Sequence, residues 1–383
     1  MSNSPLVTIV MIAYNEARYL REIMPSVLAQ TYADFEVVLI DNGSTDETPE
    51  VVAGFSDPRI RAFRNENLGL SLGYNVGVEK ARGKWIALSN CDDLWYPRKL
   101  EKQVEAMKNE RVGVVFSQVD LIADNDAPVP EEVANRFPFS FENLSCAKMY
   151  EKFFFNSNFM CAPTAVIRKD LLDARPFDAM LIQLQDFDMW VNLTQKVEFA
   201  IVQEKLLGYR VRVDGSNLSL STKNRSRVLL ELSVVYRRFF EDVDIEFFRE
   251  AFRIHLRNPE FKGQIAFEFE KAFLYLKMEE PSIRAIGLER LYALMSDKES
   301  RALGEKEYKL KMPDVWGMAL SPVYADATAM EESGKNYLEL SQQLKSSQAE
   351  LASMKETLRQ ITSGKLWKLR EKLYDILKKP VGS

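Results

Sequence analysis

The chain has 383 residues, of which 46% are hydrophobic and 28% charged, and its formal net charge is −5. This length and composition predict a soluble globular protein with two or three domains and a sizeable core. The negative charge argues against a general nucleic-acid-binding surface. Three scattered cysteines argue against a disulfide framework or a zinc site and favour a reducing compartment, the cytoplasm.

Histidine occurs once, at His255. Ser-His-Asp catalysis and histidine-rich metal sites require histidines that this chain does not have, so proton transfer is expected to use a carboxylate. No apolar run reaches the roughly 18 residues that a transmembrane helix requires. Residues 5–14 lack the basic flank and the small-residue cleavage site of a signal peptide, and are expected to form a first strand.

Apolar runs typical of buried strands alternate with segments of helical spacing through the first third of the chain. The dinucleotide fingerprint G-x-G-x-x-G is absent after the first strand, where Ala-Tyr-Asn-Glu stands instead. This rhythm predicts an α/β fold with a doubly wound, mostly parallel sheet. The expected strands lie at 6–15, 35–41, 59–63, 85–88 and 112–119.

Two adjacent carboxylates, Asp92 and Asp93, follow the expected strand at 85–88. Carboxylates at the carboxyl end of a buried strand are costly unless a positive group compensates them. A hard divalent cation that arrives with substrate phosphates is the usual compensation, and ligands of open α/β sheets bind at this edge. The alternative is a solvated loop that caps the next helix.

Several motifs follow one another along the chain: VTIVMIAYNEARYL, DNGSTDET, NENLGLSLGYNVGVEKARGKWIALSNCDDLW, CAPTAVIRKDLL, LQDFDMWVNL and KLLGYRV. In this order they resemble the family-two glycosyltransferases with the nucleotide-sugar (GT-A) fold. The resemblance covers about residues 5–222. It implies a Rossmann-like GT-A domain at 1–222, with a nucleotide-binding half at 1–122 and an acceptor half at 123–222.

The resemblance also implies which residues contact the nucleotide-sugar. Asn42 stands where the family more often has a second Asp, so the identity of the base stays open. Turn formation and helix packing are the alternative roles for Asn67, Gly69, Asn75 and Gly77, and a structural salt bridge is the alternative for Arg210 and Arg212. The implied contacts are Ala13, Tyr14, Asn15, Glu16, Asp41, Asn42, Asn67, Gly69, Asn75, Asp92, Arg210 and Arg212.

For the chemistry, the resemblance implies that Asp92 and Asp93 hold Mg²⁺ or Mn²⁺ and that Asp186 is the general base. Asn90 replaces the first acid of the usual D-x-D-D motif, and Gln185 replaces the Glu that usually precedes the base. Helix capping is the alternative role for Asp186, and Asp188 is its rival as base. A single base and no enzyme nucleophile predict inversion at the anomeric carbon.

Beyond residue 222, apolar residues at helical spacing predict an α-helical appendage of about four helices at 223–325. Apolar steps of three and four from 337 to 361 then predict a coiled coil within 331–362, and hence a homo-oligomer or a helical partner. The basic amphipathic segment 363–380, in a tail at 363–383, is suited to an anionic membrane surface. Folding back on the domain and docking on the coil are the respective alternatives.

Together these features predict a cytoplasmic inverting glycosyltransferase, peripheral at the inner face of the membrane if the tail binds lipid. The expected donor is a UDP-, dTDP- or GDP-linked sugar, and the expected acceptor is a glycan or lipid-linked glycan of bacterial surface polysaccharide synthesis. Two alternatives stay open. The altered positions Asn90 and Gln185 would suit an inactive scaffold, and a sugar nucleotidyltransferase would need a Gly-rich, basic turn after the first strand.

Overall fold

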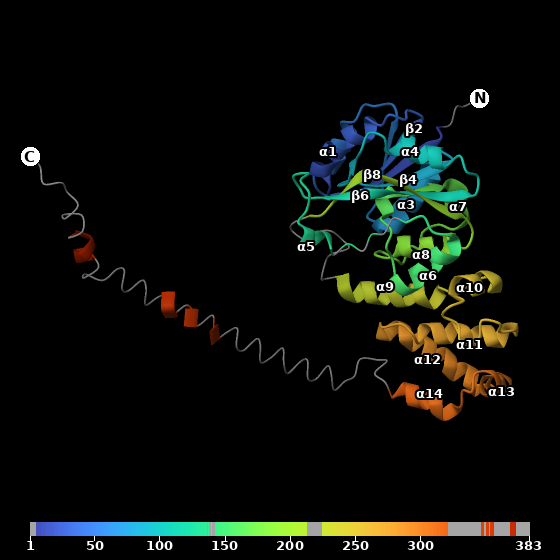
Figure 1. Cartoon of the computed structure of the whole chain (residues 1–383). Helices are drawn as coiled ribbons and strands as arrows, with labels where there is room; N and C mark the ends of the chain where they lie inside the picture. Colours follow the sequence, from blue (N-terminus) through green and yellow to red (C-terminus); the bar gives the residue numbers. More distant parts are fainter. Residues whose placement is uncertain are drawn as a thin grey trace, which may run out of the picture. The chain divides into compact units, whose positions relative to one another are not determined.

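The computed structural model describes residues 5–135, 137, 139, 142–212 and 224–320, and helical fragments at 346–347, 350–351, 353–355 and 368–372. Residues Met1–Met318 form one compact unit, and Ala319–Ser383 are grouped separately (Figure 1). Most of the predicted coiled coil and tail lies outside the described residues, so both stay predictions. Within the described part of the chain, no helix has the length and apolar character needed to cross a bilayer.

The described residues form an eight-stranded sheet in the order β3-β2-β1-β4-β7-β6-β8-β5. The strands β3, β2, β1 and β4 pair with one another in parallel, as do β6 and β8, whereas β7 pairs antiparallel with β4 and β6, and β5 pairs antiparallel with β8. The predicted α/β fold with a mostly parallel sheet is confirmed. The strands are Val7–Ala13 (β1), Phe35–Asp41 (β2), Ile60–Arg64 (β3), Trp85–Asn90 (β4), Leu94–Trp95 (β5), Val112–Ile122 (β6), Val166–Arg168 (β7) and Glu198–Arg210 (β8).

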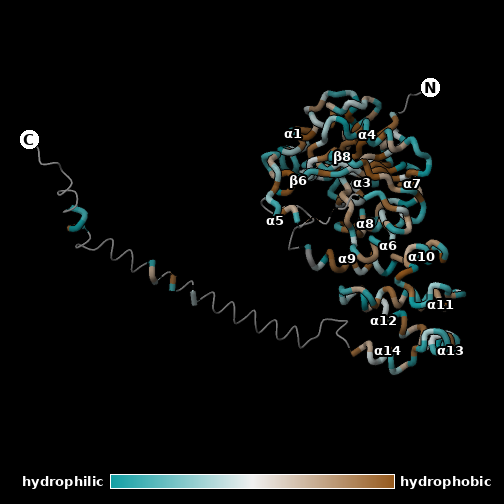
Figure 2. Tube along the Cα trace, in the orientation of Figure 1, coloured by the Kyte–Doolittle hydropathy of each residue, from teal (hydrophilic) through white to brown (hydrophobic). Residues whose placement is uncertain are grey.

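Helices cover both faces of this sheet because the central strands are apolar on both sides. All residues of β1 and β2 are buried, and alternate side chains of β1 enter two separate hydrophobic cores. Figure 2 shows the apolar residues concentrated along the strands. The helices of this part of the chain are α1 (Ala17–Leu28), α2 (Thr48–Ala53), α3 (Gly69–Lys80), α4 (Lys99–Ala106), α6 (Cys146–Asn156), η1 (Ala162–Thr164), α7 (Lys169–Ala174) and α8 (Gln185–Leu193), together with the short helix α5 (Glu131–Ala134), which has no buried residue.

Strand register brings the important loops to one edge of the sheet. Ala13 at the end of β1 is opposite Asp41 at the end of β2, and Ile12 is opposite Asn90 at the end of β4. The Tyr14–Glu16 loop, the turn after Asp41 and the Asp92–Asp93 motif therefore leave the sheet side by side. This is the edge at which ligands bind in open α/β sheets.

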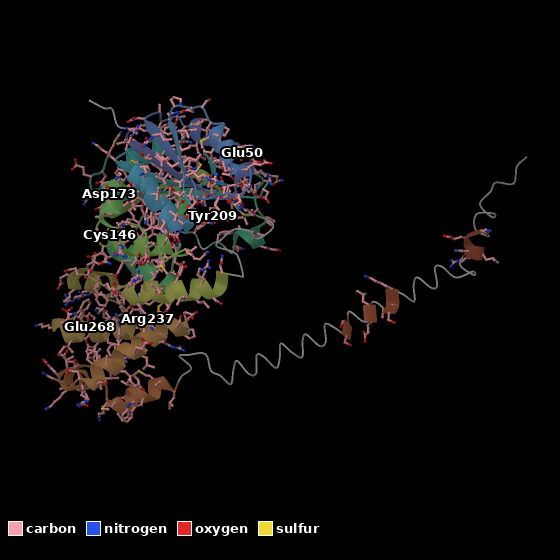
Figure 3. The ribbon with its side chains drawn as sticks, turned by 180° about the vertical axis from the view of Figure 1, so that it is seen from behind. Glu50, Cys146, Asp173, Tyr209, Arg237 and Glu268 are labelled. Carbon is pink, nitrogen blue, oxygen red and sulfur yellow. The ribbon has the colours of Figure 1, made fainter. Side chains whose placement is uncertain are left out.

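The helical appendage is confirmed and contains two helices more than the sequence analysis predicted, α13 and α14. Its helices are α9 (Arg225–Arg238), α10 (Ile245–Phe252), α11 (Gly263–Tyr275), α12 (Pro281–Ser296), α13 (Lys298–Glu307) and α14 (Met312–Ala319). Ion pairs join Arg237 on α9 to Glu289, and Glu268 on α11 to Arg290; Figure 3 labels Arg237 and Glu268 in this layer.

One aromatic core joins the appendage to the α/β part of the chain. The Tyr150 and Phe154 rings of α6 contact the Phe239 ring, which follows α9, at centroid distances of 4.8 and 5.2 Å. The Tyr236 hydroxyl of α9 donates to the carbonyl oxygen of Phe154 at 2.7 Å. Buried residues of α6, α8, α9, α10 and α11 belong to the same cluster. The appendage therefore extends the core of the α/β part of the chain.

Candidate active site

The loop after β1 and the turn after β2 are held together by Asn15. Its backbone adopts a left-handed conformation with φ 56°, its N–H donates to Ser44 Oγ at 3.0 Å, and its Oδ1 accepts from the Thr45 N–H at 2.8 Å. Asp41 Oδ1 accepts from the Ser44 N–H at 2.9 Å. Asn15 and Asp41 thus shape this edge, while the Tyr14 side chain next to them is 45% exposed and free to stack on a base.

Asn42 and Asn67 organise the turn before α3. The Asn42 amide donates to the Gly69 carbonyl oxygen at 3.0 Å and accepts from the Leu68 N–H at 3.3 Å. Asn67 Oδ1 accepts from the Gly69 N–H at 3.1 Å. Gly69 has φ +76° and no neighbour near its missing Cβ, so it is required for backbone conformation. These contacts agree with the turn-forming alternative.

Asn75 and Gly77 fix the packing of α3. The Asn75 amide donates to the Phe177 carbonyl oxygen at 2.8 Å and accepts from the Phe177 N–H at 2.9 Å. A Cβ on Gly77 would lie 2.2 Å from Val10 Cγ1. The sequence analysis allowed either a nucleotide contact or packing at these positions, and the structure gives both residues packing contacts.

The acidic motif forms hydrogen bonds both within its own loop and with β8. Asp93, which is only 1% exposed, accepts from the Asn90 amide and from the Arg210 N–H, each at 3.0 Å. Burial, followed by the charge of Asp92, raises the pKa of Asp93 well above its usual range. A cation bound beside Asp93 would stabilise its ionised form, which burial and the charge of Asp92 disfavour.

Arg210 has a structural role. Its side chain is 1% exposed, and it donates to the carbonyl oxygens of Asp92 and Ala123 at 2.8 Å each. It also pairs with Asp126 at 2.7 Å. The structural salt bridge offered as its alternative role is therefore present, and Arg210 ties the acidic motif to the end of β6.

Arg212 lies between two carboxylates of the candidate site. Its guanidinium is 2.6 Å from Glu16 Oε1 and 2.8 Å from Asp92 Oδ2, and it stacks over the Tyr19 ring at 4.5 Å. Burial raises the pKa of Glu16, although the pairing with Arg212 opposes this effect. The side chain places positive charge beside Asp92.

The residues present fit a divalent cation that takes part of its ligands from a phosphate. The described residues contain no group of three His, Cys, Asp or Glu side chains that could hold a metal. Asp92 and Asp93 supply hard oxygen ligands, and Mg²⁺ is usually bound by one or two carboxylates together with substrate phosphates and water. The site therefore suits a cation that arrives with a diphosphate better than a cation alone.

Asp186 is a partly buried carboxylate without an ion-pair partner among the described residues. It lies in the first turn of α8, accepts from the Asn158 amide at 2.9 Å and from the Phe187 N–H at 2.8 Å. Burial raises its pKa from 3.8 to about 6 despite these two hydrogen bonds. The capping residue of α8 is Leu184, not Asp186. Asp188, the alternative candidate for the general base, is paired with Arg175 at 2.9 Å. Asp186 is therefore the better proton acceptor of the two.

The two acidic segments approach the same buried groups. The Tyr74 hydroxyl donates to Asn90 Oδ1 at 3.3 Å. Burial, and then the charges of Cys91, Asp93, Asp186 and Asp92, raise the pKa of Tyr74. Burial, Asp93 and Asp186 likewise raise the pKa of Cys161. The carboxylates of the acidic motif and of α8 therefore both influence the pKa values of Tyr74 and Cys161.

Sequence reasoning missed four residues of this neighbourhood. Tyr74 and Asn158 carry no motif of their own. Lys99 is fully buried, lies 4.0 Å from the Trp95 ring centroid, and has its pKa lowered to about 7 by burial. Glu231 belongs to the appendage, and no local pattern indicates that it contacts the segment before α8. These four residues are identified only when the tertiary structure shows which distant segments lie next to one another.

Two comparisons decide the family. A model described as Glycosyl transferase family 2 matches residues 8–175. An uncharacterized glycosyltransferase of Methanocaldococcus jannaschii is 33% identical over 230 residues, which are 58% of this chain and 77% of the relative. The chain belongs to glycosyl transferase family 2. This family-2 protein is a glycosyltransferase, which argues against the scaffold and nucleotidyltransferase alternatives.

Other similar proteins differ in length and in what their names state. An Escherichia coli protein named UDP-Glc:alpha-D-GlcNAc-diphosphoundecaprenol beta-1,3-glucosyltransferase WfgD is 28% identical over 216 residues, or 56% of this chain and 79% of the relative. The crystal structure of S. aureus TarS 1-349 in complex with UDP-GlcNAc superimposes with a TM-score of 0.49 at 16% identity, covering 79% of this chain and 91% of that chain.

Proposed function

We propose that this family-2 enzyme transfers a sugar, with inversion, from a nucleotide-diphosphate sugar to a hydroxyl of a glycan or lipid-linked glycan in bacterial surface polysaccharide synthesis. The observation that supports the proposal is that Tyr74 joins the two acidic segments: its hydroxyl donates to Asn90 Oδ1 at 3.3 Å, and the charges of Asp92, Asp93 and Asp186 all raise its pKa. One segment would bind the diphosphate and the other would take a proton.

The donor would bind along the edge formed by the ends of β1, β2 and β4. Tyr14 offers an exposed ring for the base, and Asn15 and Asp41 hold the two loops around it. The name of the E. coli relative gives UDP-Glc as donor and a diphosphoundecaprenol-linked acceptor. A UDP-sugar and a lipid-linked glycan are therefore the first pair to test, with dTDP- and GDP-sugars next.

Asp92 and Asp93 would hold Mg²⁺ or Mn²⁺ together with the donor diphosphate. Such a cation supplies positive charge that stabilises the leaving nucleoside diphosphate. Arg212, which contacts Asp92 at 2.8 Å, would place a second positive charge next to the same oxygens. Arg210 would act through Asp93, since its own N–H donates to that carboxylate.

Asp186 would act as general base. Its carboxylate would take the proton of the acceptor hydroxyl as that oxygen attacks the anomeric carbon and the bond to the diphosphate breaks. Burial raises its pKa to about 6, so it stays ionised at pH 7 yet is more basic than an ordinary Asp. With one base and no enzyme nucleophile, the configuration at the anomeric carbon would invert.

The test is transfer and hydrolysis of a panel of UDP-, dTDP- and GDP-sugars with and without Mn²⁺. We expect Asp93→Asn and Asp186→Asn each to abolish transfer while the protein stays folded. Asp242→Asn is the matched control, because Asp242 is exposed at a turn with φ 55° that Asn adopts equally well. Wild-type protein that neither turns over nor binds any of these nucleotides would refute the proposal and favour a scaffold.

We propose two further partners from two C-terminal segments, most of which lies outside the described residues. The apolar steps from 337 to 361 support self-association or a helical partner, and the basic segment 363–380 supports contact with an anionic membrane, which would place the enzyme at the inner face of the membrane. Deletion of 363–383 should reduce co-sedimentation with anionic liposomes. Unchanged co-sedimentation would exclude the membrane contact.

A further inference from the structure

Glu231 of α9 binds the backbone that leads directly into α8. Its Oε1 accepts from the Ile182 N–H at 3.0 Å, and its Oε2 accepts from the Gln183 and Leu184 N–H groups at 2.8 and 2.9 Å. The side chain is 4% exposed. Three consecutive amides that converge on one carboxylate form a strong, charge-assisted set of hydrogen bonds. Asp186 follows two residues later.

The same segment is anchored by other contacts to α9 and α3. Arg238 near the end of α9 pairs with Asp178 at 2.6 Å, and Ser71 of α3 donates to the Leu181 carbonyl oxygen. Helix α9 runs beneath α6 and α8 in Figure 1. The path from 178 to 184 is therefore fixed at both ends by the appendage, and the start of α8 is fixed with it.

The charge of Glu231 also reaches Asp186. Burial is the main cause of the raised pKa of Asp186, the hydrogen bonds from Asn158 and Phe187 oppose it, and the negative charge of Glu231 adds to it. The other titratable groups facing Asp186 are Tyr74 on α3 and Cys161. Glu231 therefore raises the basicity of Asp186 and also holds the backbone of the three residues that precede α8.

We propose that Glu231 is a positioning residue for catalysis: the helical appendage places one carboxylate against the amides of residues 182–184 and thereby sets the position of Asp186. The proposal rests on the proposed function, in which Asp186 is the general base. It gives the appendage a role in the reaction, because the transferase half alone would lack the acceptor for these three amides. Gly or Ala at 231 would leave them unsatisfied, at a cost in stability.

The test compares Glu231→Gln with wild type in kcat and KM for donor, in the pH profile of kcat/KM, and in hydrogen exchange of amides 182–184. Gln keeps the size but loses the charge and turns a donor toward the amides. We expect kcat to fall about 10- to 100-fold with little change in donor KM, the acidic limb of the profile to move to lower pH, and amide protection to fall.

A second variant and a control separate position from folding. Glu231→Asp keeps the charge but is one methylene shorter, so it should also lose kcat while its acidic limb moves less. If Glu231→Gln does not fold, this variant carries the test. Glu241→Gln removes a charge from an exposed site just after α9 and should leave the pH profile unchanged.

The outcomes distinguish this proposal from the proposed function. If Asp186→Asn is inactive while Glu231→Gln, folded, keeps the wild-type kcat and pH profile, the positioning role is refuted and the base assignment stands. Loss of stability in the Glu231 variants with unchanged kcat and pH profile would also refute it. If Asp186→Asn remains active, the base assignment fails first and the positioning role fails with it.

Discussion

The replacement Asp186→Asn is expected to stabilise the protein while it abolishes transfer. A partly buried carboxylate whose pKa is raised from 3.8 to about 6 is less stable in the ionised form than it would be in water. The difference of about two pKa units corresponds to roughly 3 kcal/mol of free energy of unfolding lost at pH 7. Asn at this site carries no charge and removes that cost.

The net gain should be smaller than this figure. The new amide would face the amide of Asn158, which now donates to the carboxylate at 2.9 Å, and this contact would lose about 1 kcal/mol. A gain of about 1–2 kcal/mol remains at pH 7. The sign follows from linkage: the native state binds more protons between pH 3.8 and 6, so its stability falls as pH rises through this window. The advantage of Asn should shrink toward pH 4 and level off above pH 7.

The measurement is urea unfolding of both proteins at several pH values between 4.5 and 8. Asp188→Asn is the matched control two residues along the same helix. Asp188 pairs with Arg175 at 2.9 Å, so this variant should lose about 1–3 kcal/mol. Opposite signs of the change in free energy of unfolding would support the view that the charge of Asp186 destabilises the fold, whereas that of Asp188 stabilises it. An Asp186→Asn variant less stable than wild type, by an amount independent of pH, would refute the reasoning.

Three other perturbations test the candidate site. Gly77→Ala places a Cβ 2.2 Å from Val10 Cγ1 and should lower the free energy of unfolding in urea by about 1–3 kcal/mol, with the donor KM unchanged. Gly317→Ala is the control, because nothing lies within 4 Å of its new Cβ. A changed donor KM in Gly77→Ala would restore a nucleotide role for Gly77. Arg212→Gln should weaken UDP binding by calorimetry in EDTA more than in Mn²⁺, and equal losses would contradict its role beside the diphosphate. Removal of divalent cations should lower the transfer rate of wild type, and an unchanged rate would exclude the metal.

Much of the fold followed from the sequence because its central strands are strongly apolar. β1 and β2 are buried along their whole length, and this produces the continuous apolar runs that predict strands covered on both faces. Local spacing also indicated the helices of the appendage. It did not indicate that α9 contacts the start of α8, because the Glu231 contacts with 182–184 join residues 47 to 49 positions apart.

The roles of individual site residues were harder to infer, since polar residues at strand ends have two uses. The family resemblance implies that Asn42 and Asn75 contact the nucleotide-sugar, yet both satisfy backbone groups of neighbouring loops. Arg210 and Arg212 lie two residues apart, yet one bonds mainly carbonyl oxygens and the other bridges two carboxylates. Which use applies depends on the partner that the tertiary fold supplies, and sequence spacing does not contain that partner.

Charge balance explains why a cation and a diphosphate should enter this site together. Glu16 and Asp92 share Arg212, and Asp93 rests on the backbone N–H of Arg210. A divalent cation alone would have to compete with Arg212 for Asp92, which weakens its binding. A nucleoside diphosphate alone would bring negative charge beside two carboxylates. Together the two ligands would bring nearly balanced charges: Asp92 would hold the cation, and Arg212 would be available to pair with the phosphate oxygens. The same arginine thus makes each ligand depend on the other.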